Sequence, residues 1–147
     1  MIDKGTVISV NISKEKGTVK ESVPFCELLP EFGFENDAHA GKWHRQVSLL
    51  SYESFSAFRD RGFDISYGAF GENLLVEGID LKSLPVGTRL SVGDALIEIT
   101  QIGKECHTGC EISKRAGECI MPREGVFARV LIGGTVRPGD PVTVETP

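Results

Sequence analysis

The polar segment from Gly103 to Cys110 holds the densest group of side chains that could do chemistry. It contains Cys106, with Lys104 two residues before it and His107 directly after it. A thiol reacts as its thiolate, and a nearby lysine or protonated histidine lowers the thiol pKa. The segment follows a predicted strand, a position where loops often carry function. The pattern therefore indicates a reactive thiol at Cys106, with a small buried cysteine as the alternative.

The same segment also allows a zinc site, because Cys and His are the usual zinc ligands. The cysteines are spaced C-x3-C-x8-C, which differs from the paired C-x2-C pattern of a zinc ribbon. In extended backbone, neighbouring side chains point to opposite faces, so Cys106 and His107 would not readily bind one ion together. Structural zinc is therefore the minor alternative, and its candidate ligands are Cys106, His107, Cys110 and Cys119.

A second polar cluster runs from Asp37 to Gln46 and contains His39, Trp43 and Arg45. An arginine in such a loop can hold an anion through two parallel hydrogen bonds. The alternative is an exposed polar loop with Trp43 packed on the core. The sequence alone leaves both interpretations open.

Two further clusters are less specific. Between Tyr67 and Asn73, two glycines permit a tight turn and a close approach of backbone to a ligand, and Glu72 could simply cap or pair. Farther on, Arg123 precedes a predicted strand and Arg129 lies within it, where a solvent-facing role is the main interpretation. None of the four clusters is a phosphate loop, a catalytic triad or a paired-carboxylate site.

Short β-like runs separate these clusters. Gly93-Asp94 between two such runs predicts a hairpin, and residues 137–140 have the composition of a turn. Residues 14–34, which include Pro24 and Pro30, are expected to be loop-like. Alternation and β-branched content predict strands over residues 6–12, 45–50, 73–76, 89–92, 95–100, 126–132 and 142–145.

Helices are expected to be few. The best candidate runs from Ser51, a suitable N-cap, to Arg61, with Gly62 to end it. A second short helix is expected over residues 110–116. Many strands with sparse helices predict a mainly β fold, a closed or nearly closed β-barrel with a few short helices, in one domain spanning residues 1–147.

The composition excludes several classes of protein. The 16 basic and 21 acidic side chains sum to a net charge of −5, which argues against a nucleic-acid partner but allows a small anion bound by local arginines. The sequence contains neither a secretion signal nor an apolar run of membrane-spanning length. A cytoplasmic location without membrane insertion is therefore expected, with the cysteines as thiols or ligands rather than disulfides.

The order of the clusters resembles the MOSC family, named for the C-terminal domain of molybdenum-cofactor sulfurase. The resemblance covers roughly residues 5 to 145 and is closest to a short, stand-alone bacterial type, with matching Cys-His-x-x-Cys and Met-Pro-Arg-Glu-Gly segments. The residues that carry it are Asp37-Ala38-His39-Ala40-Gly41, Arg45 to Leu50, Gly68 to Leu74, Gly87, Gly93-Asp94-Ala95 and Cys106.

The resemblance implies a β-barrel with one essential cysteine, at Cys106, which carries sulfur as a persulfide or binds the molybdenum of the cofactor. It further implies that Arg45, Glu72 and Asn73 line the pocket and that His39 lies on a loop facing it. We also expect Lys104 and Arg123 to gather near Cys106, because an anionic molybdopterin needs local positive charge. One departure from the family pattern is Glu105, where many relatives have proline before the cysteine.

Three functions follow as hypotheses. The first is a molybdenum-cofactor-binding or sulfur-carrier protein that acts through Cys106 and receives sulfur from a donor such as a cysteine desulfurase. The second is a molybdopterin-dependent oxidoreductase that reduces N-hydroxylated compounds. The third is a non-enzymatic β-barrel module stabilised by zinc. The sequence does not decide whether the chain is an enzyme, and it does not give the oligomeric state.

Overall fold

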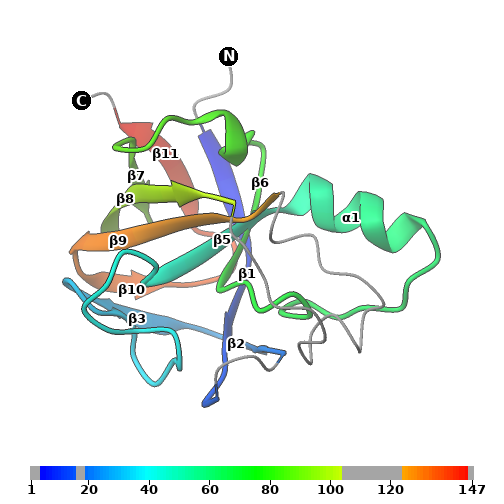
Figure 1. Ribbon diagram of the computed structural model, residues 1–147, viewed down its shortest axis with the longest axis horizontal. Helices are drawn as coiled ribbons and strands as arrows, with labels where there is room; N and C mark the ends of the chain where they lie inside the picture. The colour runs from blue at the N-terminus through cyan, green and yellow to red at the C-terminus, as the bar shows by residue number, and fades with distance from the viewer. Residues whose placement is uncertain (1–3, 16–18, 104–123, 146–147) are drawn as a thin grey trace.

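A computed structural model of the chain describes residues 4–15, 19–103 and 124–145 (Figure 1). Within these ranges, seven strands close into a β-barrel in the order β11-β7-β8-β9-β5-β6-β1, and β1 pairs with β11 to complete the ring. The predicted β-barrel is therefore confirmed. The barrel strands are β1 (Lys4–Ile12), β5 (Val47–Ser51), β6 (Leu74–Glu77), β7 (Arg89–Val92), β8 (Ala95–Ile102), β9 (Val126–Ile132) and β11 (Pro141–Glu145).

Alternation along the strands fills the barrel. In β8, Ala95, Ile97 and Ile99 are buried while the intervening residues are only partly covered, as expected when successive side chains point to opposite faces. Leu49 of β5 points into the barrel, whereas the adjacent Leu50 packs in a second apolar cluster outside it. The same wall therefore serves two cores.

The hairpin predicted at Gly93-Asp94 is confirmed. Val92 of β7 pairs with Ala95 of β8, and Gly93 has a φ of 55°, in the left-handed region that such turns use. The predicted turn at residues 137–140 is also present, because the Asp140 N–H donates to the Arg137 carbonyl at 3.1 Å. These local signals set the strand order on one side of the barrel.

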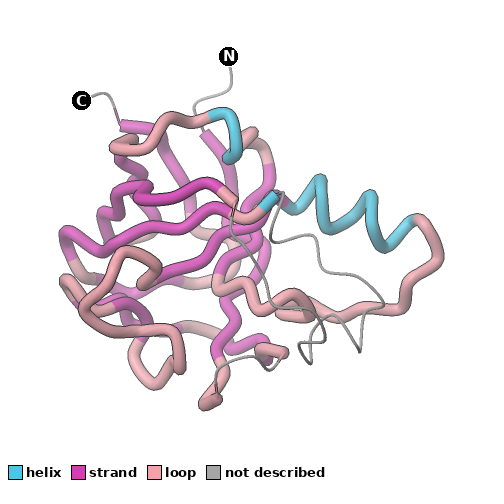
Figure 2. Tube along the Cα trace, viewed as in Figure 1, coloured by secondary structure: helices cyan, strands magenta, loops and turns pink. Residues whose placement is uncertain are grey.

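The predicted helix is α1 (Tyr52–Asp60), and it lies beside the barrel (Figure 2). The Ser51 hydroxyl accepts a hydrogen bond from the Ser54 N–H, which caps the first turn. Phe55 and Phe58 are buried against the outer cluster with Phe70. Since α1 connects β5 to β6, it allows these two strands to pair in parallel.

A short 3-10 helix, η1 (Leu81–Ser83), follows β6. The helix expected over residues 110–116 lies outside the described residues. In the part of the chain that the structure describes, no helix combines the length and the apolar composition that crossing a membrane would require.

The expectation of a loop over residues 14–34 is wrong. This stretch contains β2 (Glu21–Val23), which extends the barrel sheet from the end of β1, and β3 (Cys26–Leu29) with β4 (Gly33–Phe34). β3 also pairs with β10 (Gly134–Val136), another strand that the sequence did not predict. Pro24 and Pro30 lie between these strands rather than inside them, so they end strands without excluding them.

Candidate functional site

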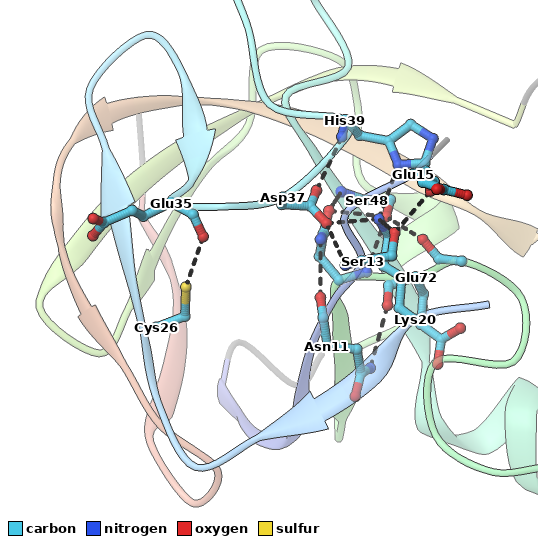
Figure 3. Close-up of polar contacts among 12 residues, drawn as sticks. Asn11, Ser13, Glu15, Lys20, Cys26, Glu35, Asp37, His39, Ser48 and Glu72 are labelled. Atoms are coloured by element: carbon cyan, nitrogen blue, oxygen red, sulfur yellow. Dashed lines mark hydrogen bonds and ion pairs between the residues drawn. The ribbon is translucent and has the colours of Figure 1, made fainter. Parts of the chain in front are cut away.

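A buried ion pair lies at the end of the barrel where β1 and β2 meet. The Lys20 Nζ atom is 2.7 Å from Asp37 Oδ1, and both side chains are 0% exposed (Figure 3). Lys20 directly precedes β2, and Asp37 follows β4. Removing two charges from water is costly, so a pair in this position needs further hydrogen bonds to hold it.

Ser13 and His39 supply those hydrogen bonds. Lys20 Nζ lies 3.1 Å from the Ser13 hydroxyl and 2.9 Å from His39 Nδ1. Asp37 accepts from the Ser13 backbone N–H at 3.1 Å and from the His39 backbone N–H at 3.3 Å. We call Ser13, Lys20, Asp37 and His39 the Lys20 cluster; it joins the end of β1, the start of β2 and the loop after β4 (Figure 3).

A pocket of about 980 Å³ opens beside this cluster. Ser13 and Asp37 contribute to its wall, while the Asp37 side chain itself stays buried in the ion pair. Apolar side chains from Ile12, Val19 and Val23 line it together with Glu15 and Glu21. The pocket is therefore lined by both polar and apolar side chains, and the apolar ones come from β1, from β2 and from the residue Val19 before β2.

Glu72 is fully buried and holds a tight turn. Its carboxylate accepts hydrogen bonds from the backbone N–H groups of Gly68 at 2.7 Å and Phe70 at 3.1 Å. Burial raises the pKa of Glu72 to about 7, although these hydrogen bonds and the charge of Lys20 act in the opposite direction. The turn in turn supports Lys20, because the Lys20 backbone N–H donates to the Gly68 carbonyl at 2.9 Å.

Gly68 is required at this contact. Its φ is 90°, and a Cβ atom built on it would lie 2.2 Å from the Lys20 carbonyl oxygen. A larger residue would therefore push the turn away from Lys20. The glycine-rich motif that the sequence singled out thus acts as a buried support for the Lys20 cluster.

Asn73 is fully buried and links three strands. Its Oδ1 atom accepts from the Ser48 backbone N–H at 2.9 Å and from the Ser48 hydroxyl at 3.1 Å. Its Nδ2 atom donates to the Asn11 carbonyl at 3.0 Å. These contacts tie β1, β5 and the start of β6 together on the barrel wall.

Arg45 lies at the opposite end of the 37–46 loop from Asp37. Its guanidinium carbon is 4.6 Å from the centre of a Trp43 ring and 5.7 Å from that of Phe127. Such stacking holds a guanidinium group while leaving its N–H donors in the plane. The Nε atom of Arg45 is buried and has no hydrogen-bond partner among the described residues.

The loop that carries Arg45 contacts the strand ends that flank residues 104–123. His44 Nε2 lies 2.7 Å from the Gln101 side-chain oxygen, near the end of β8. The Gly103 N–H donates to the Gly125 carbonyl at 2.7 Å, so the two ends of the intervening segment are adjacent. Arg45 is thus close to the point where the chain leaves β8 and returns to β9.

The predicted site residues fall into three groups. His39 and Arg45 lie on one loop and are linked through Trp43, whose Nε1 donates to the His39 carbonyl at 2.8 Å. Glu72 supports the turn beside Lys20, and Asn73 bonds across the barrel wall. Cys106, Lys104 and Arg123, together with the candidate zinc ligands His107, Cys110 and Cys119, lie outside the described residues.

Cys26 is the cysteine within the described ranges, and it is buried. Burial is the largest cause that raises the pKa of its thiol, and its Sγ lies 3.4 Å from the Glu35 carbonyl. It is therefore a poor candidate for a reactive thiol. Across residues 4–15, 19–103 and 124–145, no three His, Cys, Asp or Glu side chains converge to hold a metal ion.

The sequence analysis missed Lys20 and Ser13. Neither belongs to a recognisable motif, and Lys20 lies in a stretch that was expected to be a loop. The only signal was indirect, since Asp37 and His39 form part of the quoted family motif and a buried carboxylate needs a cationic or donor partner.

Comparison with known proteins supports one assignment. A crystal structure of the YuaD protein from Bacillus subtilis superposes with a TM-score of 0.80 at 20% identity, covering 98% of this chain and 97% of that one. The YiiM protein from Geobacillus stearothermophilus gives a TM-score of 0.75 at 22% identity, over 97% of this chain and 75% of that one.

In sequence, the chain is 24% identical to the uncharacterized protein YflK of Bacillus subtilis (strain 168), over 93% of this chain and 72% of that protein. The two solved structures share the fold of this chain at low sequence identity. The model of the MOSC domain matches residues 36–143, which include the Asp37–His39 motif, the Gly68–Asn73 turn and all strands from β5 to β10. The chain therefore belongs to the MOSC domain family.

Proposed function

We propose that this chain binds the molybdenum cofactor and that the thiolate of Cys106 is the protein ligand to its molybdenum. The MOSC domain family is associated with molybdenum-cofactor-related proteins. A thiolate suits a soft or high-valent metal centre better than a carboxylate does. Among the described residues, Arg45 carries the proposal, because it offers an unsatisfied buried donor beside the strand ends that flank the cysteine segment.

The described residues fit an anionic ligand. A buried guanidinium nitrogen without a partner is costly, and an anion bound beside it would remove that cost. Trp43 and Phe127 hold the guanidinium in place from the loop and from β9. This supports Arg45 as the group that would bind an anionic part of the cofactor, such as its phosphate, through charge-assisted hydrogen bonds.

His39 is the second group on this loop that could contact the ligand. Its ring is tied to Lys20, and its backbone carbonyl accepts the Trp43 indole N–H. The loop therefore holds a histidine and an arginine in a fixed relation. The net charge of −5 does not oppose this role, because the positive groups are local and several acidic side chains, among them Glu53, Glu77 and Asp80, lie exposed elsewhere.

The roles of the protein and the cofactor are separable. When bound, the cofactor would supply the redox or sulfur chemistry of its metal centre, while the protein supplies binding, orientation and charge. Arg45 would anchor the anionic end, Cys106 would hold the metal, and the Glu72 turn would keep the neighbouring wall rigid. A persulfide on Cys106, loaded by a donor such as a cysteine desulfurase, is the competing use of the same thiol.

Metal and pterin analysis of the purified protein tests the proposal. The protein should be produced in cells that make the cofactor, as wild type, Cys106→Ser and Cys26→Ser. Cys26 is the matched control because it is a buried cysteine on β3 to which the proposal gives no part in binding. We expect the wild type and Cys26→Ser to contain the same amounts of molybdenum and of pterin, and Cys106→Ser to lose both.

Three outcomes would overturn the proposal. Stoichiometric zinc without pterin would identify a zinc-stabilised module, and equal molybdenum in all three proteins would exclude Cys106 as the ligand. Protein that carries no molybdenum but releases sulfur from Cys106 on treatment with cyanide would replace cofactor binding with sulfur transfer.

A further inference from the structure

We propose that Lys20 is a positioning residue that keeps the His39 ring neutral with its proton on Nε2, so that His39 meets a ligand as a hydrogen-bond donor. Neither Lys20 nor the state of His39 follows from the sequence. The inference about the ring rests on the described contacts alone. Its consequence for the ligand rests on the proposed function.

The donor inventory of Lys20 fixes the direction of its bond to His39. An ammonium group has three N–H donors and no acceptor. It lies within hydrogen-bond distance of Asp37 Oδ1 at 2.7 Å, His39 Nδ1 at 2.9 Å and the Ser13 hydroxyl at 3.1 Å, and it can only donate to each of them. His39 Nδ1 must therefore accept, and the proton of the neutral ring must lie on Nε2.

A second proton on the ring is opposed by the same contact. Protonation of Nδ1 would place two donors, one on His39 and one on Lys20, facing each other at 2.9 Å. Lys20 cannot readily move away, because its side chain is 0% exposed and paired with Asp37. The imidazolium form would therefore require the buried Lys20–Asp37 pair to move.

The backbone of Lys20 is also fixed. Its N–H donates to the Gly68 carbonyl, and Gly68 packs so closely that a Cβ atom would lie 2.2 Å from the Lys20 carbonyl oxygen. Glu72 holds Gly68 from the other side at 2.7 Å. The geometry of this turn is thus transmitted through Lys20 to the ring of His39.

The surrounding charges do not reverse this conclusion. Asp37 accepts from the His39 backbone N–H at 3.3 Å, but its charge is balanced by Lys20. Glu15 lies in the segment after β1, and Glu72 lies in the turn beside Lys20. Both carboxylates favour a positive ring in general, whereas the direct donor contact at Nδ1 acts on the atom that would take the proton.

The consequence is that the loop carries two hydrogen-bond donors and no free imidazole acceptor at Nδ1. One donor is Nε2–H of the neutral His39 ring, and the other is the guanidinium of Arg45, with Trp43 between them. An oxygen or sulfur atom that carries negative charge is the chemistry that such a loop recognises. His39 is not available at Nδ1 as a base, because that lone pair already accepts from Lys20.

Long-range ¹H–¹⁵N NMR of cofactor-free protein at pH 6.5 tests the proposal. The chain has 3 histidines, and the signal lost in His39→Gln identifies the ring. We expect a neutral His39 ring with Nε2–H in the wild type. In Lys20→Met with Asp37→Asn, which removes both buried charges together, the ring should become about half protonated, because an unperturbed histidine has a pKa of about 6.5.

A matched control removes an exposed ion pair instead. Lys82 lies 2.7 Å from Glu124, so Lys82→Met with Glu124→Gln makes the same change in charge elsewhere and should leave His39 neutral. Ser13→Ala retains the ion pair and the His39 contact, and it should also leave the ring neutral. It is a second control, and the ring state of the wild type still tests the proposal if the double replacement at the cluster does not fold.

Three results would overturn the proposal. They are a wild-type ring that carries its proton on Nδ1 or is half protonated at pH 6.5, a ring that stays neutral after Lys20 and Asp37 are replaced, and a ring that is half protonated in Ser13→Ala. These measurements use no cofactor. Their failure would therefore leave the proposed function standing, and the absence of molybdenum from purified protein would leave this result intact.

Discussion

The apolar interior of the barrel wall and the Lys20–Asp37 pair of the Lys20 cluster are both buried, but they are held together in different ways. The wall uses apolar side chains such as Ile97 and Ile99, which contribute by area and can exchange for others of similar volume. The cluster instead depends on individual atoms, with Lys20 within hydrogen-bond distance of three partners. The wall therefore provides stability, whereas burying the charges of the cluster costs stability and fixes the geometry of one loop.

The largest effect is expected from breaking the buried ion pair. Lys20→Met leaves Asp37 buried without its counter-charge, and we expect the free energy of unfolding to fall by about 3–5 kcal/mol. Urea unfolding followed by circular dichroism measures this change. The control Lys82→Met removes one partner of the exposed pair with Glu124 and should change stability by less than about 1 kcal/mol. Equal losses in the two variants would mean that burial does not distinguish these pairs.

The next effect depends on pH and concerns Glu72. Its folded pKa of about 7 lies above the usual 4.5, so the folded state binds more protons than the unfolded state between these values. Stability should therefore decrease as pH rises through this window and level off above pH 7, by an amount on the order of 3 kcal/mol. Unfolding free energies at pH 5, 6, 7 and 8 test the direction.

Glu72→Gln removes the titrating group and should flatten this dependence. The exposed Glu21→Gln should keep the wild-type profile. If Glu72→Gln and the wild type lose stability in parallel between pH 5 and pH 8, the dependence has another source.

The smallest effect is expected within the barrel wall. Ile97→Val removes one methyl group from a fully buried position and should cost about 0.5–1.5 kcal/mol. The NMR signature of His39 should not change, because the wall tolerates such a substitution without moving polar atoms. A change in the protonation state of the His39 ring in this variant would contradict the view that the wall and the cluster are independent.

The sequence predicted the wall well because its signals are local. The Gly93-Asp94 hairpin, the cap at Ser51 and the alternation in β9 each require only neighbouring residues. The strands β3 and β10 were missed because each is short and gains its stability from pairing with the other across more than 100 positions of sequence. Pairing of that kind leaves little trace in composition.

The candidate site was predicted in part. The resemblance pointed to His39, Arg45, Glu72 and Asn73, and the structure places them on one loop, one turn and one wall. The resemblance did not point to Lys20, since a single lysine outside any motif carries no pattern. Only the fold brings residues 13, 20, 37 and 39 together, so their relation could not be derived from spacing.

The most direct test of the central claim is the binding of isolated molybdenum cofactor to wild type, Arg45→Ala and Cys106→Ala. A charge-assisted contact contributes roughly 1.5–3 kcal/mol, and 1.4 kcal/mol corresponds to a factor of ten. Arg45→Ala should therefore bind at least about tenfold more weakly while its fold and the alkylation rate of Cys106 remain unchanged. The matched control is Arg61→Ala, since Arg61 also stacks over two rings, at 5.3 and 5.4 Å, but lies at the end of α1.

We predict wild-type affinity for Arg61→Ala and weakened binding for both Arg45→Ala and Cys106→Ala. Equal affinity in all four proteins would contradict the account, because it would show that neither the Arg45 loop nor Cys106 takes part in binding the cofactor.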